Sequence, residues 1–481
     1  MGHKLKIAGW MAVGALAGAL TTMQLQAVAR NNMTPLPLEE LQQLAAVFSM
    51  IKSDYVESTD EKKLITDAIS GMVTNLDPHS AYYDKKAWKE FREGTSGAFV
   101  GVGIEITMED GLVKVVSPIE DSPAAAAGLM TNDLITKIDT MPVKGLSITE
   151  AVKRMRGEPG TVVRLQVLRR AENRSFSVTI TRARIITRSV KAKTLDNGYG
   201  WIRISQFQDR TVEDFAAKLE ELAAATPQLQ GLVLDLRNDP GGLLDAAVAV
   251  SAVFLPADVP VVSTNGQLEE SRYVFQANKR YYWRRSGTDP LAQLEERTKG
   301  LFKTIPIVVL VNEGSASASE IVAGALQDYK RATIMGNQTF GKGSVQTVRA
   351  LGPDTGLKIT TARYYTPNGR SIQAKGIVPD VLVDETPEGN LFAALSTRES
   401  DLNKHLENGT EDPADAIARD KAREAAQARL EERQRENPGQ RLMPEFGTDK
   451  DFRLTQALNH LQGKPVAVSK TLKARETDAK E

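Results

Sequence analysis

The sequence contains no cysteine, which excludes thiol nucleophiles, disulfide bonds and thiolate metal sites. The absence of thiols fits an oxidising compartment without requiring one. Histidine is also scarce, and its four positions are His3, His79, His405 and His460. The stretch 82–404 therefore contains no histidine, so catalysis carried by that stretch needs a base other than imidazole.

Neither sign of charge is in excess, because 61 Lys and Arg residues balance 61 Asp and Glu residues. This balance removes the usual electrostatic reason to expect nucleic acid as a partner. Hydrophobic residues make up 41% and charged residues 25%, which is typical of a soluble globular protein. At 481 residues the chain is too long for one compact core, and a prior of roughly 150 residues per domain predicts several domains.

The N-terminus carries an apolar run, Ile7–Leu20, after Lys4 and Lys6. Residues 27–29 read AVA, the small-x-small pattern at which export signals are cleaved. We predict a signal peptide over residues 1–29, because the run is shorter than the roughly 20 residues that span a bilayer. An uncleaved anchor is the alternative. Both interpretations predict export to a bacterial periplasm, with inner-membrane association if the signal is retained.

Residues 30–95 and 96–184 have different patterns. In residues 30–95, apolar side chains such as Leu41, Leu44 and Phe48 recur at helical steps, which predicts amphipathic helices that pack on the core or on a second subunit. Residues 96–184 predict a compact β-rich module with one helix, Ile148–Arg156. Its expected strands are Phe99–Ile106, Leu112–Val116, Val162–Arg169 and Ser175–Thr181.

Residues 185–396 alternate between strand and helix patterns, which predicts α/β architecture with a largely parallel sheet. The expected elements are Gly200–Ile204, Val212–Ala225, Gly231–Leu236, Leu243–Phe254, Ile305–Val311 and Ser317–Gln327. Residues 397–481 are rich in charge and form the last region. They predict a polar helix over Asp415–Arg435, a short amphipathic helix over Phe452–Leu461, and disorder from Lys464 onward.

A serine-rich segment follows a short β-branched run. Residues 314–320 read GSASASE, and the apolar spacing after them is helical. This predicts a buried strand, a tight turn and a helix N-terminus, whose backbone N–H groups lie where an oxyanion would form beside Ser317. The alternative is that these serines only cap the helix.

A lysine between two glycines lies downstream, where residues 341–346 read GKGSVQ. Lysine acts as a general base only if burial lowers its pKa towards neutrality, and flanking glycines let the backbone enclose Lys342 closely. Taken alone, Lys342 could equally be a surface lysine on a hairpin. In a core without histidine, a turn-borne serine and this lysine are the remaining familiar pair of nucleophile and base.

Paired glycines open another helix, where residues 238–242 read NDPGG after a predicted buried strand. Gly241 and Gly242 would expose unhindered N–H groups, which are natural donors for an oxyanion hole. A plain β-turn before the helix is the alternative.

Together these three segments resemble the C-terminal processing (tail-specific) peptidases. The resemblance covers about Leu36–Val383 and includes LDPHS at residues 76–80. It implies a multidomain α/β protein in which a crotonase/ClpP-like protease core, residues 185–396, follows an inserted PDZ domain, residues 96–184. Helical regions at residues 30–95 and 397–481 would flank them. In relatives, additions such as the charged C-terminal region serve assembly.

The resemblance also implies roles for individual residues. Ser317 would be the nucleophile, Lys342 the general base and Gln346 the residue that orients the lysine. The oxyanion hole would be formed by the N–H of Ala318 and that of a glycine in the Gly241-Gly242 pair. Substrates would be exported or membrane-attached proteins with free C-terminal tails.

The β-rich module resembles the PDZ domain of these peptidases. Residues 122–129 read SPAAAAGL, a common stretch of bacterial PDZ domains. The expected peptide-binding residues, in the carboxylate-binding loop and the first groove strand, are Val100, Gly101, Val102, Gly103 and Ile104. Backbone N–H groups of such a loop bind a chain terminus while the peptide adds as a strand. The alternative is that Gly101 and Gly103 only mark a bulge or turn.

Two other functional classes are consistent with part of the sequence. A non-catalytic PDZ scaffold or chaperone would be favoured if Ser317, Lys342 or Gln346 were replaced, and all three are present. A crotonase-like acyl-thioester enzyme could also use a Gly-Gly loop, but its substrates are cytoplasmic. We therefore expect a serine endopeptidase that needs no cofactor or metal, forms a homo-oligomer and could require an activating adaptor protein.

Overall fold

The computed structural model of the protein describes residues 37–119, 121–283, 285–390, 397–409, 423–428, 431–432, 435 and 445–470. The predicted signal peptide lies outside these residues, as does most of the predicted helix Asp415–Arg435. The chain divides into two compact units, Met1–Gly71 and Met72–Glu481, which are described separately below. Among the helices in the described ranges, none has both the length and the apolar character needed to cross a bilayer.

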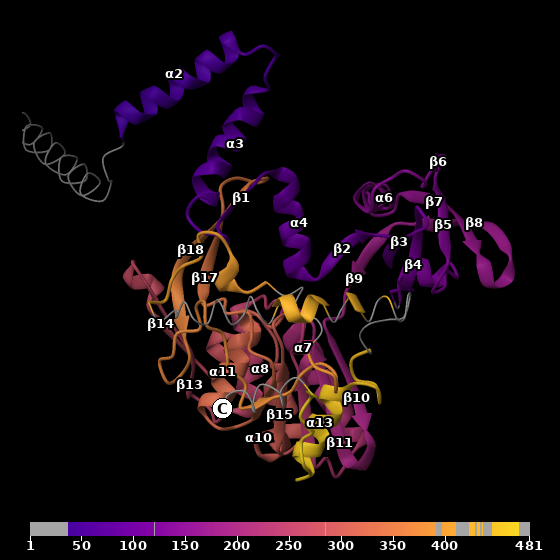
Figure 1. The fold of residues 1–481 in the computed structure, drawn as a ribbon, viewed down its shortest axis with the longest axis vertical. Coiled ribbons are helices and arrows are strands. Elements are labelled where there is room, and N and C mark those ends of the chain that lie inside the picture. Colours follow the sequence, from indigo (N-terminus) through magenta and orange to yellow (C-terminus); the bar gives the residue numbers. More distant parts are fainter. Residues whose placement is uncertain are drawn as a thin grey trace, which may run out of the picture. The chain divides into compact units, whose positions relative to one another are not determined.

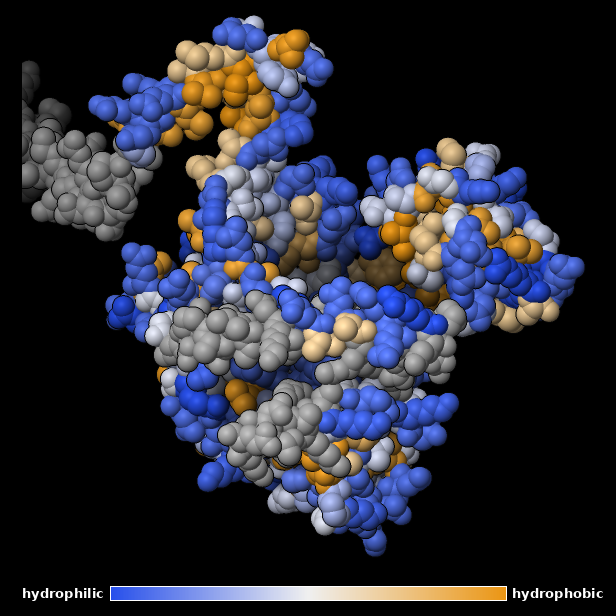
Figure 2. Space-filling view, viewed as in Figure 1, coloured by the Kyte–Doolittle hydropathy of each residue, from blue (hydrophilic) through white to orange (hydrophobic). Residues whose placement is uncertain are grey.

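The first unit contains helix α2 (Leu38–Asp54) and most of helix α3 (Glu61–Thr74) (Figure 1). Acidic residues in the first turn of α2 and Lys52 in its last turn stabilise the helix, because their charges interact favourably with its dipole. No residue of α2 is buried. Figure 2 shows apolar surface over these helices, and the large apolar side chains that α2 exposes are Leu38, Leu41, Leu44, Val47 and Met50.

The β-rich module has a core of its own, formed by side chains such as Val113, Ile135 and Leu165. Its strands lie in the order β3-β4-β5-β7-β8, with β6 beside β5. Strand β3 is therefore an edge strand. The elements are β3 (Ile104–Glu109), β4 (Leu112–Pro118), α5 (Pro123–Ala126), β5 (Leu134–Ile138), β6 (Met141–Pro142), α6 (Ile148–Met155), β7 (Val162–Arg169) and β8 (Arg174–Thr181).

A two-stranded ribbon precedes and follows this sheet, formed by β2 (Ala98–Gly101) and β9 (Ala183–Ile186). The prediction of one continuous strand over Phe99–Ile106 is therefore wrong. The chain breaks at Gly103, whose φ of 83° is unfavourable for other residues and lets the backbone lie against Ser122.

A six-stranded sheet forms the core of the α/β region, in the order β10-β11-β12-β15-β16-β19. Within this sheet, strands β11, β12, β15, β16 and β19 run parallel, as expected from the alternating pattern, and β10 pairs antiparallel with β11 at the edge. The strands are β10 (Val190–Leu195), β11 (Tyr199–Ile204), β12 (Gly231–Asp235), β15 (Ile307–Val311), β16 (Thr333–Gly336) and β19 (Val381–Leu382).

Helices cover both faces of this sheet, because successive side chains of a strand point to opposite faces. Leu234 and Val309 lie in one core with helices α7 (Thr211–Ala225), α8 (Leu244–Phe254) and α11 (Ala318–Asp328). Val233 and Val308 lie in the other core, with helix α13 (Phe452–Leu461). The C-terminal helix thus belongs to the core of the α/β region.

A second sheet lies in the order β1-β18-β13-β14, with β17 also paired to β18. Its strands are β1 (Ala81–Tyr83), β13 (Pro260–Gly266), β14 (Tyr273–Gln276), β17 (Ser344–Ala350) and β18 (Gly356–Tyr365). Lys342 lies two residues before the start of β17. Helix α4 (Lys85–Ser96) follows β1, and helices α9 (Pro290–Arg297) and α10 (Leu301–Thr304) precede β15.

The predicted disorder from Lys464 is wrong for residues 464–470. Ser469 is buried and donates to the Asp384 carboxylate, and the Lys470 N–H donates to the Pro387 carbonyl at 2.9 Å. Residues 471–481 lie outside the described residues.

Candidate active site

Ser317 occupies the turn between β15 and α11 in a strained conformation. Its φ of 56° and ψ of −112° are rare for a residue with a side chain, and such a conformation costs on the order of 1–3 kcal/mol. The Ser317 N–H donates to Glu320 Oε2 at 2.8 Å, which holds the turn. Strain kept in place by its surroundings is typical of functional positions.

The Glu320 carboxylate connects the serine turn to the lysine loop. The oxygen that accepts from Ser317 also accepts from the Lys342 N–H at 2.9 Å. Its other oxygen accepts from the Gly341 N–H at 2.7 Å and from the Thr339 hydroxyl at 2.6 Å. Burial raises the pKa of Glu320 to about 7, while these hydrogen bonds oppose the rise. One buried side chain therefore holds the backbones of Ser317 and Lys342 together.

The Lys342 side chain is placed where its charged form is unfavourable. Burial, together with the nearby positive charge of Lys358, lowers its pKa to about 8. The carboxylates of Glu399, Glu320 and Asp77 oppose this shift. A substantial neutral fraction at mildly basic pH is what a lysine general base requires.

Tyr364 contacts both candidate catalytic residues. Its buried hydroxyl donates to the Lys342 carbonyl. Burial raises the pKa of Tyr364 well above its usual range, so this phenol stays protonated, and the nearby Ser317 side chain has a small lowering effect on the pKa of this phenol. The sequence analysis missed Tyr364, because it lies in β18 outside the recognisable motifs.

The paired glycines lie directly against the serine turn. A Cβ added at Gly241 would come within 2.7 Å of Ser317 Cβ and 2.8 Å of the Ala318 nitrogen. Gly242 has a φ of 144°, and a Cβ there would lie 1.9 Å from the Phe207 carbonyl oxygen. Both positions therefore require glycine.

The two glycines differ in the availability of their N–H groups. The Gly241 N–H donates to Asp239 Oδ1 at 2.8 Å. Within the described ranges, the N–H groups of Gly242 and Ala318 have no acceptor. Of the donors expected from the sequence, Gly242 and Ala318 are therefore available to an oxyanion, and Gly241 supports the turn.

Gln346 takes part in a network beside the lysine loop. Its amide donates to Ser344 Oγ at 3.0 Å and to Thr360 Oγ1 at 3.2 Å. The Thr360 N–H in turn donates to the Ser80 hydroxyl, which donates to Asp77. The described residues show no hydrogen bond between Gln346 and Lys342, so its orienting role stays a prediction.

His79, which precedes the histidine-free stretch 82–404, lies close to the network around the lysine loop. His79 Nε2 lies 2.7 Å from Glu399 Oε2, although the two residues are 320 positions apart. The other oxygen of Glu399 accepts from Gln373, whose side-chain oxygen accepts from the Gly343 N–H at 3.0 Å. The network therefore ends on the residue next to Lys342. No local pattern in the sequence could have paired His79 with Glu399.

The predicted PDZ residues lie on two separate elements. Val100 and Gly101 belong to β2 and pair with β9. Val102 is buried in the module core, and the Gly103 carbonyl accepts from the Ser122 hydroxyl at 2.9 Å. Ile104 begins the edge strand β3.

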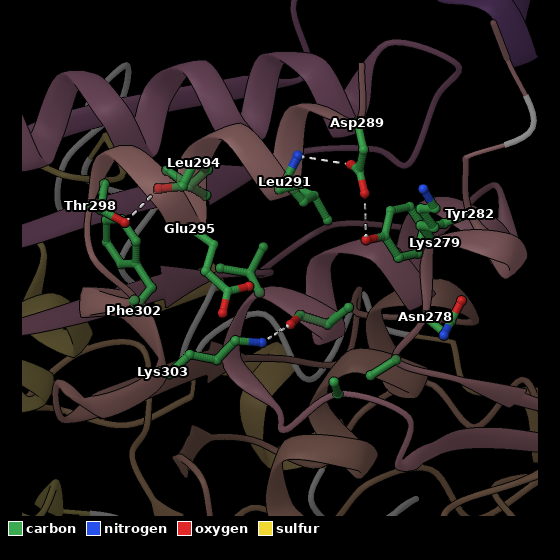
Figure 3. A pocket seen from close by; sticks show the side chains of 16 residues that line it. Asn278, Lys279, Tyr282, Asp289, Leu291, Leu294, Glu295, Thr298, Phe302 and Lys303 are labelled. Carbon is green, nitrogen blue, oxygen red and sulfur yellow. Dashed lines mark hydrogen bonds between the residues drawn. The ribbon is translucent and has the colours of Figure 1, made fainter. Parts of the chain in front are cut away.

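A cavity of about 300 Å³ lies apart from these residues, between α8, α9 and α10 (Figure 3). Its polar groups bond within the protein: the Tyr282 hydroxyl donates to Asp289, and Lys303 donates to the carbonyls of Ala252 and Leu255. None of the candidate catalytic residues lines it. In the described part of the chain, no group of three or more His, Asp or Glu residues could hold a metal ion.

Comparisons with known proteins identify relatives for most of the chain. The model of peptidase family S41 matches residues 198–383, the PDZ domain model matches residues 100–180, and the model of the activating protease CtpB N-terminal domain matches residues 8–87. A carboxy-terminal-processing protease of Bartonella bacilliformis is 41% identical over 401 residues, covering 83% of this chain and 87% of that protein.

More distant relatives carry related names. A probable CtpA-like serine protease of Staphylococcus haemolyticus is 35% identical, covering 75% of this chain and 68% of that protein. Among solved structures, the photosystem II D1 C-terminal processing protease is 28% identical with a TM-score of 0.39, covering 71% of this chain and 92% of that one.

Proposed function

The chain belongs to peptidase family S41 as a carboxy-terminal-processing serine protease with a PDZ domain, and we propose that Ser317 and Lys342 are its catalytic dyad. The observation that carries this proposal is the shared Glu320 oxygen, which accepts from the backbone N–H groups of both residues. The lowered pKa of Lys342 and the strained backbone of Ser317 support the same assignment.

In the proposed reaction, neutral Lys342 takes the hydroxyl proton of Ser317 as the serine oxygen attacks the scissile carbonyl carbon. The negative charge on the carbonyl oxygen is stabilised by the N–H groups of Gly242 and Ala318. When the intermediate collapses, the C–N bond breaks and the Lys342 ammonium protonates the leaving amine. Lys342 then takes a proton from the water that attacks the acyl ester, and returns it to the Ser317 oxygen as the ester C–O bond breaks.

The proposed substrates are exported or membrane-attached proteins with accessible C-terminal tails. Edge strand β3 offers unpaired backbone groups to an added peptide strand, with Ile104 and Ile106 half-buried along it. The turn at Val102-Gly103 precedes this strand and is the proposed carboxylate-binding loop. The PDZ domain would present the tail, gate the site, or do both.

Assembly and localisation complete the proposal. The exposed apolar side chains of α2 support a homo-oligomer or an adaptor-binding surface. The apolar run Ile7–Leu20 supports export to the periplasm, with inner-membrane association if the run is retained.

Digestion of an unstructured protein by purified wild type, Ser317→Ala and Lys342→Ala tests the dyad. We expect cleavage by the wild type and a loss of at least about 1,000-fold in both variants. Lys218→Ala on α7 removes an exposed surface ion pair and should leave the rate unchanged. Equal cleavage by the wild type and both dyad variants would refute the proposal.

A further inference from the structure

An ion pair connects the start of helix α13 to the end of strand β12, which leads into the glycine turn at residues 238–242. Asp451 caps α13 by accepting from the Leu454 N–H at 3.2 Å. The same carboxylate accepts two hydrogen bonds from Arg237, at 2.8 Å to Oδ1 and 2.6 Å to Oδ2. Arg237 follows β12 and stands directly before residues 238–242, although Asp451 is 214 positions away.

Arg237 is held from two sides and has no access to water. It is 2% exposed, and its second partner is Asp235, which accepts from Arg237 Nε at 2.9 Å. Asp235 also accepts from the Trp201 indole at 3.1 Å and from Arg203 at 3.3 Å. A buried guanidinium needs both carboxylates, because a single one would leave part of it desolvated without a partner.

Residues just before α13 cover this ion pair. The Phe446 ring lies 4.3 Å from the Arg237 guanidinium and 4.5 Å from that of Arg203. The Gly447 N–H donates to Asp451 Oδ2 at 3.1 Å. Residues 446–451 therefore cover the Arg237–Asp451 ion pair and shield its charges from solvent.

The first residues of the turn after Arg237 form hydrogen bonds with the segment that contains Ser317. The Asn238 N–H donates to Asn312 at 2.8 Å, and the Asp239 carbonyl accepts from the Ala316 N–H at 2.9 Å and from Ser319 Oγ at 3.0 Å. Arg237 therefore anchors the strand end from which this turn starts, and the turn ends at Gly242.

We propose that Asp451 is a positioning residue for catalysis, which holds Arg237 so that the Gly242 N–H points at the developing oxyanion. This inference rests on the proposed function of Gly242. It gives the segment 445–461 a part in the catalytic unit, whereas the sequence predicted only an assembly role for the C-terminal region.

Asp451→Asn tests this inference because asparagine caps a helix as well as aspartate does. The variant therefore removes the charge of the ion pair and keeps the cap of α13. We expect kcat to fall at least about 10-fold while KM changes less than about 2-fold, because an oxyanion donor acts in the transition state. Amide hydrogen exchange in residues 236–246 should become faster.

Asp133→Asn is the matched control. Asp133 forms a two-point ion pair with Arg169 in the PDZ domain, at 2.8 and 2.9 Å, in which the Arg169 side chain is 11% exposed. Its loss should lower stability in that domain while kcat on a short peptide and exchange in residues 236–246 stay at wild-type values. If Asp451→Asn does not fold, Asp451→Glu keeps the charge, and its longer side chain should still lower kcat by displacing Arg237.

The outcomes separate this inference from the proposed function. A folded Asp451→Asn with wild-type kcat and exchange would overturn the positioning role. A wild type without peptidase activity would count against the proposed function, and faster exchange in Asp451→Asn alone would then still support the contact between α13 and the glycine turn.

Discussion

At the scale of single residues, the hydrogen bonds of Glu320 bear on two interpretations of the serine-rich segment. Ser317 at a helix start could have been only a cap, and Lys342 only a surface charge. Glu320 fits the S-x-x-E pattern of a capping box, and its side chain does accept from the Ser317 N–H. The same oxygen also accepts from the Lys342 N–H, which no helix cap requires.

The pH dependence of the reaction should report the titration of Lys342. The neutral amine is the active form, so kcat/KM should rise with pH and level off above a midpoint near pH 8. Lys358→Met removes a positive neighbour, which should raise the pKa of Lys342 and move the midpoint to higher pH. A pH–rate profile on a peptide substrate measures both, and a midpoint unchanged by Lys358→Met would contradict this account.

Lys342 should also reduce the stability of the fold. Its folded pKa of about 8 lies below the usual 10.5, so folding costs free energy wherever the unfolded chain is protonated. This free-energy cost has its full value below about pH 8 and becomes smaller as the pH rises. It disappears above the pKa that Lys342 has in the unfolded chain. Lys342→Met should therefore be more stable than wild type at pH 7, by about 1–3 kcal/mol.

Urea unfolding of both proteins at pH 7 and pH 10.5 checks this prediction. The stability difference should be smaller at the higher pH. A Lys342→Met variant that is less stable than wild type at pH 7 would show that the amine is paired rather than desolvated.

At the scale of elements, local patterns predicted most of the α/β region. Strand β15 (Ile307–Val311) is apolar along its length, and strand β12 (Gly231–Asp235) is apolar up to Asp235, because both faces of a parallel sheet are buried. The pattern failed at Phe99–Ile106, where Gly103 bends a run that looks continuous. It also failed after Lys464, where contacts with residues around Asp384 order a polar segment.

The exposed apolar side chains of helix α2 lead us to expect a self-association surface there. Leu41 and Leu44 are 44% and 50% exposed, and burying the exposed half of both would contribute about 1.5–3 kcal/mol. Changing both to glutamate should weaken the oligomer at least about 100-fold, measured by sedimentation velocity. Gln42→Glu with Gln43→Glu adds the same charge to the helix and should leave assembly intact. A wild type that is monomeric at all concentrations would remove the basis for this surface.

At the scale of the whole molecule, the site is assembled from segments that the sequence keeps far apart. Ser317, Lys342 and the glycine pair could be found because each lies in a short motif. Glu399 could not be paired with His79, nor Asp451 with Arg237, because only tertiary packing brings these residues together. The surrounding network was therefore beyond sequence reasoning, whereas the two residues of the proposed dyad each lie in a short motif.

The dyad is tested most directly by locating the acyl group during turnover. A peptide ester is mixed with excess enzyme and quenched in acid, and the attachment site is mapped by mass spectrometry of proteolytic fragments. We expect an acyl group on Ser317 in the wild type and none in Ser317→Ala, which should also fail to cleave. Cleavage by Ser317→Ala, or acyl transfer to another residue of the wild type, would contradict it.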